Sequence, residues 1–431
     1  MNSNPKVVII GGGAAGFMAA ITCAEANPRA EVTILEKAAR PLGKVRISGG
    51  GRCNVTHACF DPAQLVTFYP RGGKALRGPF MRFQPRDTIA WFAARGVVLK
   101  TEADGRVFPV TDSSATIVDC LLHAAHAAGV TLRTHAPVTR VSRSARSGFQ
   151  IELGTGETLA ADGVLLATGG ERRPLAWAQD LGHTIQPPVP SLFTFTVQDA
   201  RLAGLAGVSV PLAHLRLTES GLAQSGPLLI THWGLSGPAV LRLSAWGARV
   251  LHDRQYQAEL RINWLPDWTR TAAHAHLHAV KTAQARRAPG SQALFDLPLR
   301  LWQRLALAAG VNEGQRWADL TKLQLQRLLG ELTAGVYAIN GKGAFKEEFV
   351  TCGGVTLDEV NFKTMESRCC PGLYLAGEIL DVDGVTGGFN FQSAWTTGWL
   401  AGNALSRRGD REQSQETPRF SQARAHVNFG A

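Results

Sequence analysis

The hydrophobic positions near the start of the chain predict a short buried strand over residues 6–10, which read Lys-Val-Val-Ile-Ile. A continuous apolar run of this length is typical of a parallel strand covered on both faces. An Ala-rich segment then predicts a helix that ends near Ala26, before Asn27-Pro28. A second apolar run over residues 31–35 predicts a second strand. The order strand, helix, strand predicts the first unit of a doubly wound α/β fold.

The turn between the first strand and the helix has the pattern Gly-x-Gly-x-x-Gly over residues 11–16, and Glu36 follows the second strand, about 20 residues further on. Gly11 permits a tight turn, Gly13 lets the backbone approach a pyrophosphate, and Gly16 lets the helix lie against the strand. Free N–H groups at the helix N-terminus favour phosphates, and Glu36 can accept hydrogen bonds from a ribose. We therefore interpret the turn as a dinucleotide site rather than one that only packs.

Two more Gly-rich segments carry candidate ligand contacts. Residues 47–56 read Ile-Ser-Gly-Gly-Gly-Arg-Cys-Asn-Val-Thr, and three consecutive glycines do not suit the interior of a helix or strand. We interpret this segment as a loop against the cofactor, with polar contacts from Ser48, Arg52 and Asn54; a flexible surface loop is the alternative. Residues 163–170 predict a buried strand that ends in a Gly turn, where doubly wound sheets collect ligands.

The hydrophobic pattern changes along the rest of the chain. Alternating runs and turns over residues 191–262 predict mostly strands. Helical spacing follows over residues 264–335, with Trp302, Leu305 and Leu307 expected on core faces. Strand patterns then return, and a helix is predicted from Gln392 to Leu405. We divide the chain into a first part of the dinucleotide-binding domain, a β-rich insert, a helical insert, a return through the β-rich insert, a second part of the first domain and a polar tail, over residues 1–190, 191–263, 264–335, 336–345, 346–408 and 409–431.

Composition narrows the class of protein. Hydrophobic residues make up 45% of the 431 positions and charged residues 18%, which excludes intrinsic disorder. No apolar run reaches the length of about 18 residues that a membrane span needs. We also expect no secretory signal, because a strand-like run begins within five residues of Met1. The cysteines number seven and include no Cys-x-x-Cys pair, so we expect reduced thiols, no metal site and a cytoplasmic location. His123 and His126 lie three apart on a predicted helix, and we interpret them as solvated or at the edge of the core rather than as metal ligands.

The formal net charge is +11, which favours polyanionic partners. RNA binding is nevertheless disfavoured, because Lys and Arg are scattered along the chain rather than clustered with aromatic residues. The charge leaves that alternative open. A phosphorylated cofactor and an acidic substrate are also compatible with it.

Four longer sequence segments narrow the class of protein further. They are residues 47–56, 231–241, 350–355, and 364–368 with the 372–390 run that follows. Together with the first Gly-rich turn, they resemble the BaiN/YhiN-type bacterial flavoproteins, also described as aminoacetone oxidase-like. The resemblance covers about residues 6–405. It implies an α/β fold with a split Rossmann-like FAD-binding domain, a β-barrel-like insert and a small helical insert. It also implies an FAD-dependent oxidoreductase, in a family usually described as using NAD(P) as well.

The motifs and the resemblance together give a set of expected FAD contacts, which are Gly11, Gly13, Ala14, Ala15, Gly16, Glu36, Lys37, Lys44, Ser48, Gly50, Gly51, Arg52, Cys53, Asn54, Val138, Ala167, Thr168, Gly169, Gly170, Gly377, Glu378, Gly387, Gly388, Phe389 and Asn390. One segment departs from the family pattern, which commonly has Gly-Arg-Lys before the Ser-Gly-Gly-Gly loop. Here the basic residues are split in Gly43-Lys44-Val45-Arg46, so Lys44 and Arg46 both remain candidates. Gly387-Gly388, before a predicted helix, is expected to bring that helix N-terminus to the reduced ring.

The flavin itself carries the redox chemistry in such proteins, so no catalytic residue is assigned. Cys53 could lie close to the ring and act as a redox thiol, but a disulfide-reductase mechanism is disfavoured, because no second cysteine shares a Cys-x-x-Cys motif with it. Only one Gly-x-Gly-x-x-Gly turn is present, so NAD(P)H, if it is used, is expected to bind transiently near the flavin. The expected substrate is a small organic molecule. An FAD-dependent RNA-modifying enzyme and a non-catalytic FAD redox sensor are the alternatives, and the oligomeric state stays open.

Overall fold

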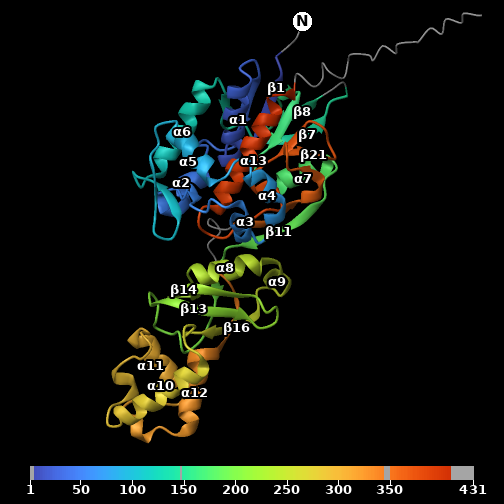
Figure 1. Cartoon of the computed structure of the whole chain (residues 1–431). Helices are drawn as coiled ribbons and strands as arrows, with labels where there is room; N and C mark the ends of the chain where they lie inside the picture. Colours follow the sequence, from blue (N-terminus) through green and yellow to red (C-terminus); the bar gives the residue numbers. More distant parts are fainter. Residues whose placement is uncertain (1–3, 146–147, 344–349, 409–431) are drawn as a thin grey trace, which may run out of the picture.

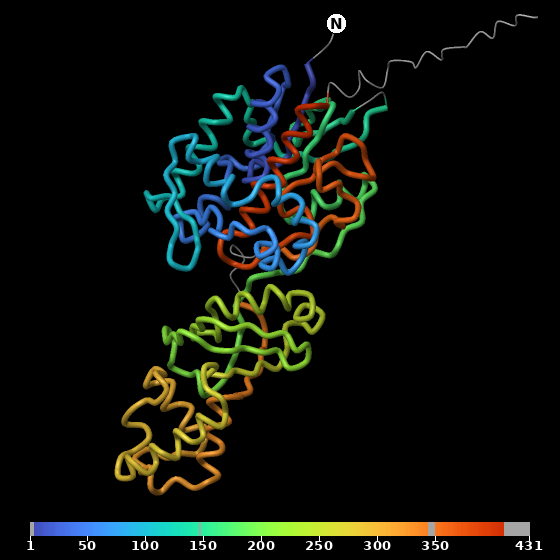
Figure 2. Tube along the Cα trace, in the orientation of Figure 1, coloured from blue at the N-terminus to red at the C-terminus, as the bar shows by residue number. Residues whose placement is uncertain are grey.

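The structure is a computed structural model that describes residues 4–145, 148–343 and 350–408. Its three parts follow one another along the length of the molecule (Figure 1). The first part contains the blue and teal start of the chain together with the red C-terminal segment. The tube view shows how the chain leaves this part, passes through a green sheet and a yellow-to-orange helical lobe, and returns (Figure 2). The first part is therefore assembled from two stretches of sequence separated by the insert.

The first part is built on a seven-stranded sheet with the order β20-β21-β22-β10-β1-β2-β6. Its inner strands are parallel, because β1 pairs with both β2 and β10, and β10 pairs with β22. Residues 7–10 of β1 are all buried, as expected for a strand that helices cover on both faces. The strands are Lys6–Ile10 (β1), Glu31–Leu35 (β2), Thr131–Arg133 (β6), Gly163–Leu166 (β10), Val360–Asn361 (β20), Glu366–Ser367 (β21) and Leu373–Leu375 (β22).

Helices α1 (Ala14–Ala26) and α13 (Phe389–Leu405) pack against each other over this sheet. Two glycines of α13 make the close approach possible. A Cβ at Gly398 would lie 2.5 Å from the Ala15 carbonyl oxygen, and one at Gly402 would lie 2.4 Å from that of Ala19. This contact joins the first helix of the chain to the last described one.

Helix α13 begins at Phe389 and not at Gln392, where the sequence pattern placed its start. Gly388 ends the preceding loop with a φ of +92°, a conformation that favours glycine. Its carbonyl oxygen then accepts the first helical hydrogen bond, from the Gln392 amide at 3.0 Å. The predicted cofactor contacts Phe389 and Asn390 therefore belong to the first helical turn.

Shorter elements surround the main sheet. Two small sheets have the orders β3-β5-β4 and β7-β8-β9, and β11 pairs with β19. The strands are Thr56–His57 (β3), Leu99–Thr101 (β4), Arg106–Pro109 (β5), Val138–Arg143 (β7), Phe149–Leu153 (β8), Thr158–Ala161 (β9), Ile185–Ser191 (β11) and Val350–Val355 (β19). The helices are Gly43–Ile47 (α2), Pro62–Leu65 (α3), Gly73–Phe80 (α4), Pro85–Ala93 (α5), Ser114–Ala127 (α6) and Arg172–Asp180 (α7). Across the described residues, no helix has both the length and the apolar character that crossing a membrane requires.

The insert forms a second seven-stranded sheet with the order β17-β16-β13-β14-β15-β12-β18. Its strands pair antiparallel throughout, and it has its own hydrophobic core, which includes Leu215, Leu228 and Ile262. Two helices, α8 (Pro238–Trp246) and α9 (Ala248–Asp253), also lie within this mostly β segment. The strands are Phe195–Thr196 (β12), Ser209–Leu217 (β13), Ala223–Thr231 (β14), Gly234–Ser236 (β15), Ala258–Asn263 (β16), Gly335–Ile339 (β17) and Gly341–Lys342 (β18).

The helical lobe lies between β16 and β17 and consists chiefly of α10 (Arg270–Ala283), α11 (Leu299–Ala308) and α12 (Lys322–Ala334). Trp302 and Leu305 are buried in its core, as the sequence pattern predicted. Leu307 was expected there as well but is 56% exposed, because two residues beyond Leu305 a helix has turned by about 200°. The α/β fold with a β insert and a helical insert is confirmed.

The end of the described chain is anchored more firmly than its polar sequence indicates. The Asn27 side chain donates to the Ser406 carbonyl oxygen at 2.9 Å, and Arg408 lies 3.7 Å from Glu366. Ser406 is itself buried. The predicted polar tail, residues 409–431, lies outside the described residues.

These contacts determine how far the chain can be shortened at its C-terminal end without a loss of stability. We expect deletion of residues 409–431 to leave the melting temperature and the flavin content unchanged. Deletion of everything after Leu405 also removes the Ser406 and Arg408 contacts, and a loss of about 1–2 kcal/mol should lower the melting temperature by several degrees. Thermal unfolding of both truncations checks this, and equal melting temperatures would show that the anchor contributes nothing.

Candidate functional site

The three glycines of the first turn have different surroundings. Gly11 has a φ of +110°, and a Cβ there would lie 2.4 Å from the Ala167 carbonyl oxygen. A Cβ at Gly16 would lie 2.0 Å from the Gly11 carbonyl oxygen. A Cβ at Gly13 would meet no described atom within 4 Å. The fold itself therefore requires Gly11 and Gly16, whereas Gly13 borders open space.

That space lies in front of the N-terminus of α1, because Gly13 is the residue that caps this helix. The first turn of α1, which includes Ala14 and Ala15, contains no acidic residue. Helix N-termini attract anions through their free N–H groups and the positive end of the helix dipole. The arrangement suits a pyrophosphate.

Glu36 is fixed at the end of β2 by two backbone donors. Its carboxylate accepts from the Gly12 amide at 2.9 Å and from the Ala38 amide at 2.8 Å. Each of these bonds occupies one carboxylate oxygen, and a carboxylate has further lone pairs to accept hydroxyl groups. Glu36 thus lies beside the Gly-rich turn, where a ribose on the same dinucleotide is expected.

Lys37 and the segment that leads into Val138 lie next to Glu36. The Ala136 amide donates to the Glu36 carbonyl oxygen at 2.9 Å, so the segment that leads into β7 runs beside the end of β2. The Val138 side chain is buried in the core, which leaves its backbone for any ligand contact. Lys37 extends to Glu171 at 2.6 Å instead.

The turn after β10 reaches the same region. Gly11 packs against Ala167, and the neighbouring Thr168 has a buried hydroxyl without a hydrogen-bond partner among the described residues. A Cβ on Gly169 would lie 3.6 Å from Glu378 Oε2 and 4.0 Å from Lys44 Nζ. Residues predicted from four separate segments are therefore brought together around the first turn.

Gly170 and Gly377 serve the packing at this point. A Cβ at Gly170 would lie 2.6 Å from the Thr351 side chain, and one at Gly377 would lie 3.1 Å from the Ala15 Cβ. Gly377 also has a φ of +74°. These contacts place the 377–378 segment against the first turn of α1.

The structure distinguishes the two basic candidates of α2. Lys44 forms an ion pair with Glu378 beside Gly169, whereas Arg46 turns back to the Pro41 carbonyl oxygen at 3.4 Å.

We therefore expect Lys44→Met to weaken FAD binding by about 2- to 5-fold, the range of an exposed ion pair. Arg46→Met is the matched control and should bind FAD normally. Titration of the flavin-free proteins with FAD measures both, and the reverse order would place Arg46 at the cofactor.

The 47–56 loop and the start of α13 lie side by side. Asn54 accepts a hydrogen bond from the Gly388 amide at 3.0 Å and donates to the Thr56 carbonyl oxygen at 2.9 Å. A Cβ at Gly388 would lie 2.5 Å from that same Thr56 oxygen. Gly388 is therefore required by this loop, and its N–H is already used. The contact with Thr56 thus accounts for this glycine without a ligand, and the approach of the Gly387-Gly388 backbone to the flavin stays a prediction.

Within the 47–56 loop, space remains beside the glycines at the tip, whereas hydrogen bonds and an ion pair fix the side chains around them. Cβ atoms at Gly50 and Gly51 would meet nothing within 4 Å. Ser48 donates to the Val45 carbonyl oxygen at 3.0 Å. Arg52 is bound to Glu102 at 2.7 Å and lies over the Phe108 ring. Arg52 thus stabilises the loop against the β4–β5 hairpin, and its contact with FAD stays a prediction.

Cys53 is fully buried and has a φ of +61°. Burial raises the pKa of its thiol to about 12, so the thiol stays protonated near neutral pH. Every described cysteine is free. A protonated, buried thiol is a poor nucleophile, which argues against redox chemistry at Cys53.

A stack of aromatic rings at the start of α13 carries no signal in the sequence. His57 lies 4.7 Å from Phe389 between ring centroids, and Phe68 lies 4.4 Å from Phe389. Gly387 adjoins the stack, and the Tyr69 hydroxyl donates to the Phe389 carbonyl oxygen at 2.6 Å. His57 directly follows the Gly-rich loop and could have been suspected for that reason. Phe68 could not, because its place depends on the fold.

The orientation of His57 leaves one ring nitrogen unused. Nε2 lies 3.1 Å from the Asp104 carbonyl oxygen, an acceptor, so Nε2 carries the proton. Nδ1 is then a lone-pair acceptor, and it is buried without a partner among the described residues. Burial lowers the pKa of His57, which keeps the ring neutral at neutral pH.

A buried ion pair at the junction with the insert was also not predicted from the sequence. Asp383 is fully buried and forms an ion pair with Arg71. Ser191 donates to the same carboxylate at 2.8 Å, and Arg71 donates to the Ala245 carbonyl oxygen of α8 at 2.7 Å. Desolvation raises the pKa of Asp383, while Arg71 opposes that shift. The pair thus ties the 383–390 segment to the insert. His123 and His126, in contrast, are exposed on α6, as expected.

Comparison with known proteins extends these observations to the whole chain. Residues 5–404 match the family described as the HI0933-like protein Rossmann domain. The chain is 31% identical to the 3-dehydro-bile acid delta(4,6)-reductase of Clostridium scindens over 417 residues, which cover 94% of this chain and 99% of that protein. It is 32% identical to the ribosomal RNA dihydrouridine synthase of Escherichia coli over 412 residues, which cover 92% and 97% of the two chains.

A solved structure agrees with the fold. The 3-ketosteroid-delta4-(5alpha)-dehydrogenase from Rhodococcus jostii RHA1 superimposes with a TM-score of 0.50, over 94% of this chain and 97% of that one. The sequence identity is 17%, so this likeness concerns the fold alone.

Proposed function

The chain belongs to the HI0933-like family of FAD-dependent oxidoreductases, and from this premise we propose that it reduces a carbon–carbon double bond conjugated to a carbonyl group. A small organic molecule is the first candidate substrate. The proposal rests on one observation above all. Two relatives of nearly equal identity, which match almost the whole chain, bear names that describe this same change of bond.

The two named activities share their chemistry. A delta(4,6)-reductase of a 3-dehydro-bile acid reduces an olefin in conjugation with a ring ketone. Dihydrouridine differs from uridine by saturation of one ring double bond, which is conjugated to a ring carbonyl. Both changes add a hydride to one carbon and a proton to its neighbour. The shared step supports a conjugated olefin as the reacting group, whatever molecule carries it.

The described residues fit FAD by shape and by donor chemistry. Gly13 and the α1 N-terminus offer an open, positive cradle for a pyrophosphate. Glu36 offers carboxylate lone pairs at the end of β2. Thr168 offers a buried hydroxyl that still needs a partner. When bound, FAD would supply the hydride from its isoalloxazine ring.

The chain's own residues would hold and shield the reacting groups. The open tip at Gly50 and Gly51 and the first turn of α13 would border the ring, with the stack of His57, Phe68 and Phe389 behind them. Apolar walls exclude water, which would otherwise compete for the hydride acceptor's carbonyl. His57 Nδ1 accepts and does not donate at neutral pH, so its role there would be to orient an N–H or O–H group.

A nicotinamide cofactor, if it is the reductant, would bind transiently at the same ring. This follows from the presence of one Gly-x-Gly-x-x-Gly turn in the sequence. Rapid mixing of the oxidised protein with NADH and with NADPH under anaerobic conditions measures the rate of flavin bleaching with each. Bleaching by one of them identifies the donor, and bleaching by neither removes nicotinamide from the proposal.

A second experiment tests the oxidative half of the cycle. The FAD-loaded protein is reduced by light under anaerobic conditions, with EDTA as the electron donor, and mixed with a conjugated dienone steroid. The saturated ketone of the same skeleton is the matched control. We expect the flavin to be reoxidised by the dienone, with one double bond saturated for each flavin, and not by the saturated ketone. Reoxidation by neither the dienone nor uridine-containing RNA would contradict the proposal.

RNA is the second candidate substrate, and the net charge of +11 is the observation that favours it. The same reduced protein is mixed with ribosomal RNA fragments and with the same fragments in which dihydrouridine replaces uridine. Reoxidation by the first alone, at a rate that falls steeply with salt, would assign a nucleobase as the olefin carrier.

A further inference from the structure

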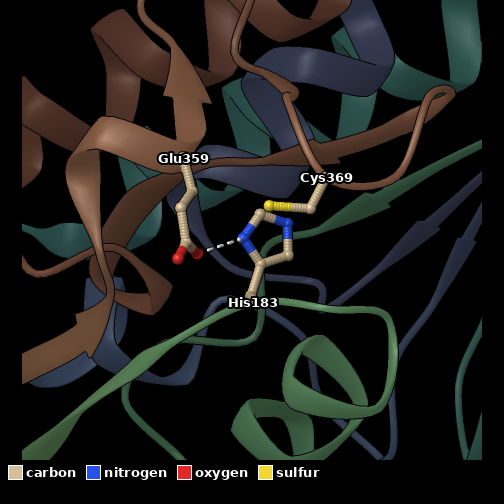
Figure 3. Close-up of side chains that lie close together, drawn as sticks. All are labelled: His183, Glu359 and Cys369. Carbon is tan, nitrogen blue, oxygen red and sulfur yellow. Dashed lines mark hydrogen bonds and ion pairs between the residues drawn. The ribbon is translucent and has the colours of Figure 1, made fainter.

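Three metal-ligating side chains from distant parts of the sequence meet at the β20–β21 edge of the main sheet (Figure 3). His183 lies between α7 and β11, Glu359 directly before β20, and Cys369 two residues after β21. One ligand atom from each, an imidazole nitrogen, a carboxylate oxygen and the sulfur, lie within 4.8 Å of one another. In Figure 3 the carboxylate and the thiol both approach the imidazole. The fold thus brings together one nitrogen, one oxygen and one sulfur ligand atom, a combination that no sequence motif indicates.

Hydrogen bonds fix the tautomer of the imidazole. His183 Nδ1 lies 3.0 Å from Glu359 Oε2, and Nε2 lies 2.7 Å from Ser367 Oγ. Ser367 Oγ already accepts from the Cys369 amide at 3.1 Å and from the Cys370 amide at 2.8 Å. Its own proton is therefore the one that it shares with Nε2. Nδ1 carries the ring proton and donates it to Glu359, at the position that a cation would take.

Access to this position comes from the solvent side. The His183 side chain is fully buried, whereas that of Glu359 is 23% exposed and Cys369 is exposed. The Thr184 amide holds Glu359 Oε2 at 2.9 Å, so the carboxylate is positioned by the backbone. Two ligands are thus fixed by the fold, and the third stands at the surface.

We propose that His183 Nδ1, Glu359 and Cys369 form a binding site for a zinc-like divalent cation. Imidazole, carboxylate and thiolate are the ligands that zinc takes, whereas magnesium and calcium prefer oxygen alone. Tetrahedral zinc holds its ligand atoms roughly 3.4–3.6 Å apart. The nitrogen and oxygen, 3.0 Å apart, are already near that separation. The three ligand atoms lie within 4.8 Å of one another, so the exposed thiol needs to approach by at most about 1.4 Å. Water completes the coordination.

Binding would rearrange protons in a defined way. The thiol releases its proton to solvent, and the imidazole proton moves from Nδ1 to Nε2 by exchange with water. Nε2–H then needs a lone pair on Ser367. Ser367 would turn its own hydroxyl hydrogen away from Nε2, release the longer of its two amide hydrogen bonds, that from Cys369, and accept from Nε2–H in its place. The hydroxyl then supports the ligated imidazole, as outer partners of metal-bound histidines commonly do.

The site would join the strand that leads into the insert to the edge of the main sheet. His183 stands just before β11, which leads toward the insert, and the other two ligands frame the β20–β21 hairpin. A bound cation would therefore stabilise the folded chain, because it binds the native arrangement alone. The inference is independent of the proposed reaction.

The experiment uses the full-length, FAD-loaded protein after treatment with a chelator. Titration with Co²⁺ reports tetrahedral coordination through visible bands at wavelengths longer than those of oxidised flavin. We expect one Co²⁺ for each chain, displaced by Zn²⁺. Cys369→Ser should abolish these bands. Cys59→Ser, which alters a partly exposed free thiol outside the cluster, is the matched control and should leave them unchanged.

Two further variants separate a metal role from a structural one. Glu359→Gln keeps the side-chain shape and should weaken Co²⁺ binding strongly. Ser367→Ala removes the support of the imidazole and should weaken it about 10- to 100-fold. Melting temperatures in chelator show whether each variant still folds, and Cys369→Ala replaces any serine variant that does not. Absence of Co²⁺ and Zn²⁺ binding, or a spectrum that Cys369→Ser and Glu359→Gln leave intact, would overturn the proposal.

Discussion

Replacement of Gly13 by valine is expected to yield a folded protein that contains no FAD. Gly13 has a φ of −97° and a ψ of −171°, an extended conformation that valine adopts readily. A Cβ there meets no described atom within 4 Å, so the branched side chain enters open space. That space is where the α1 N-terminus would receive the pyrophosphate. The loss should be complete, while the poorer helix cap costs at most about 2 kcal/mol.

The measurement compares flavin content and thermal unfolding of the flavin-free proteins. Gly13→Val should be colourless as purified and should take up no FAD on titration, with a melting temperature within a few degrees of the flavin-free parent. Gly16→Val is the contrasting variant. Its Cβ would lie 2.0 Å from the Gly11 carbonyl oxygen, so it should fail to fold. A yellow Gly13→Val protein with normal FAD content would show that the pyrophosphate lies elsewhere.

Replacement of Arg71 by methionine is expected to yield a folded protein of much lower stability. It leaves the fully buried Asp383 carboxylate without its cation, a change that typically costs about 3–5 kcal/mol. Methionine keeps much of the volume of the arginine stem, so the loss reflects charge more than packing. Arg249→Met is the matched control, because its pair with Asp381 lies nearer the surface and should cost about 0–1 kcal/mol.

The pH dependence of this loss has a definite sign. Desolvation raises the pKa of Asp383, and removal of Arg71 takes away the attraction that opposes the shift. A carboxyl whose pKa is higher in the folded state stabilises that state below its unfolded pKa and loses this contribution as pH rises through the folded pKa. The gap between Arg71→Met and the parent should therefore be widest near about pH 8 and narrow toward about pH 5. Thermal unfolding across this range measures it, and a constant gap would mean that Asp383 does not protonate.

Several features of the site followed from the sequence because they are local. The Gly-x-Gly-x-x-Gly turn states which positions lack a Cβ, and the structure gives Gly11 and Gly16 the close contacts that this implies. The apolar run of β1 states that both faces are covered, which the burial of residues 7–10 confirms. The predictions for Leu307 and for the start of α13 were wrong. Which residues of a helix face the core, and where the helix begins, depend on single residues, whereas a pattern averages over several.

The sequence by itself determined the order of elements, the split of the first domain, the Gly-rich turns and the class of cofactor. These depend on backbone freedom and on the period of burial, both of which are written within a few consecutive residues. Only the tertiary structure decided that Asn54 holds Gly388, that Lys44 rather than Arg46 meets Glu378, and that His183 faces Glu359. Such contacts join residues far apart in the chain. They are fixed by which strands pair in the sheet and by how side chains pack between them, and no local pattern contains that information.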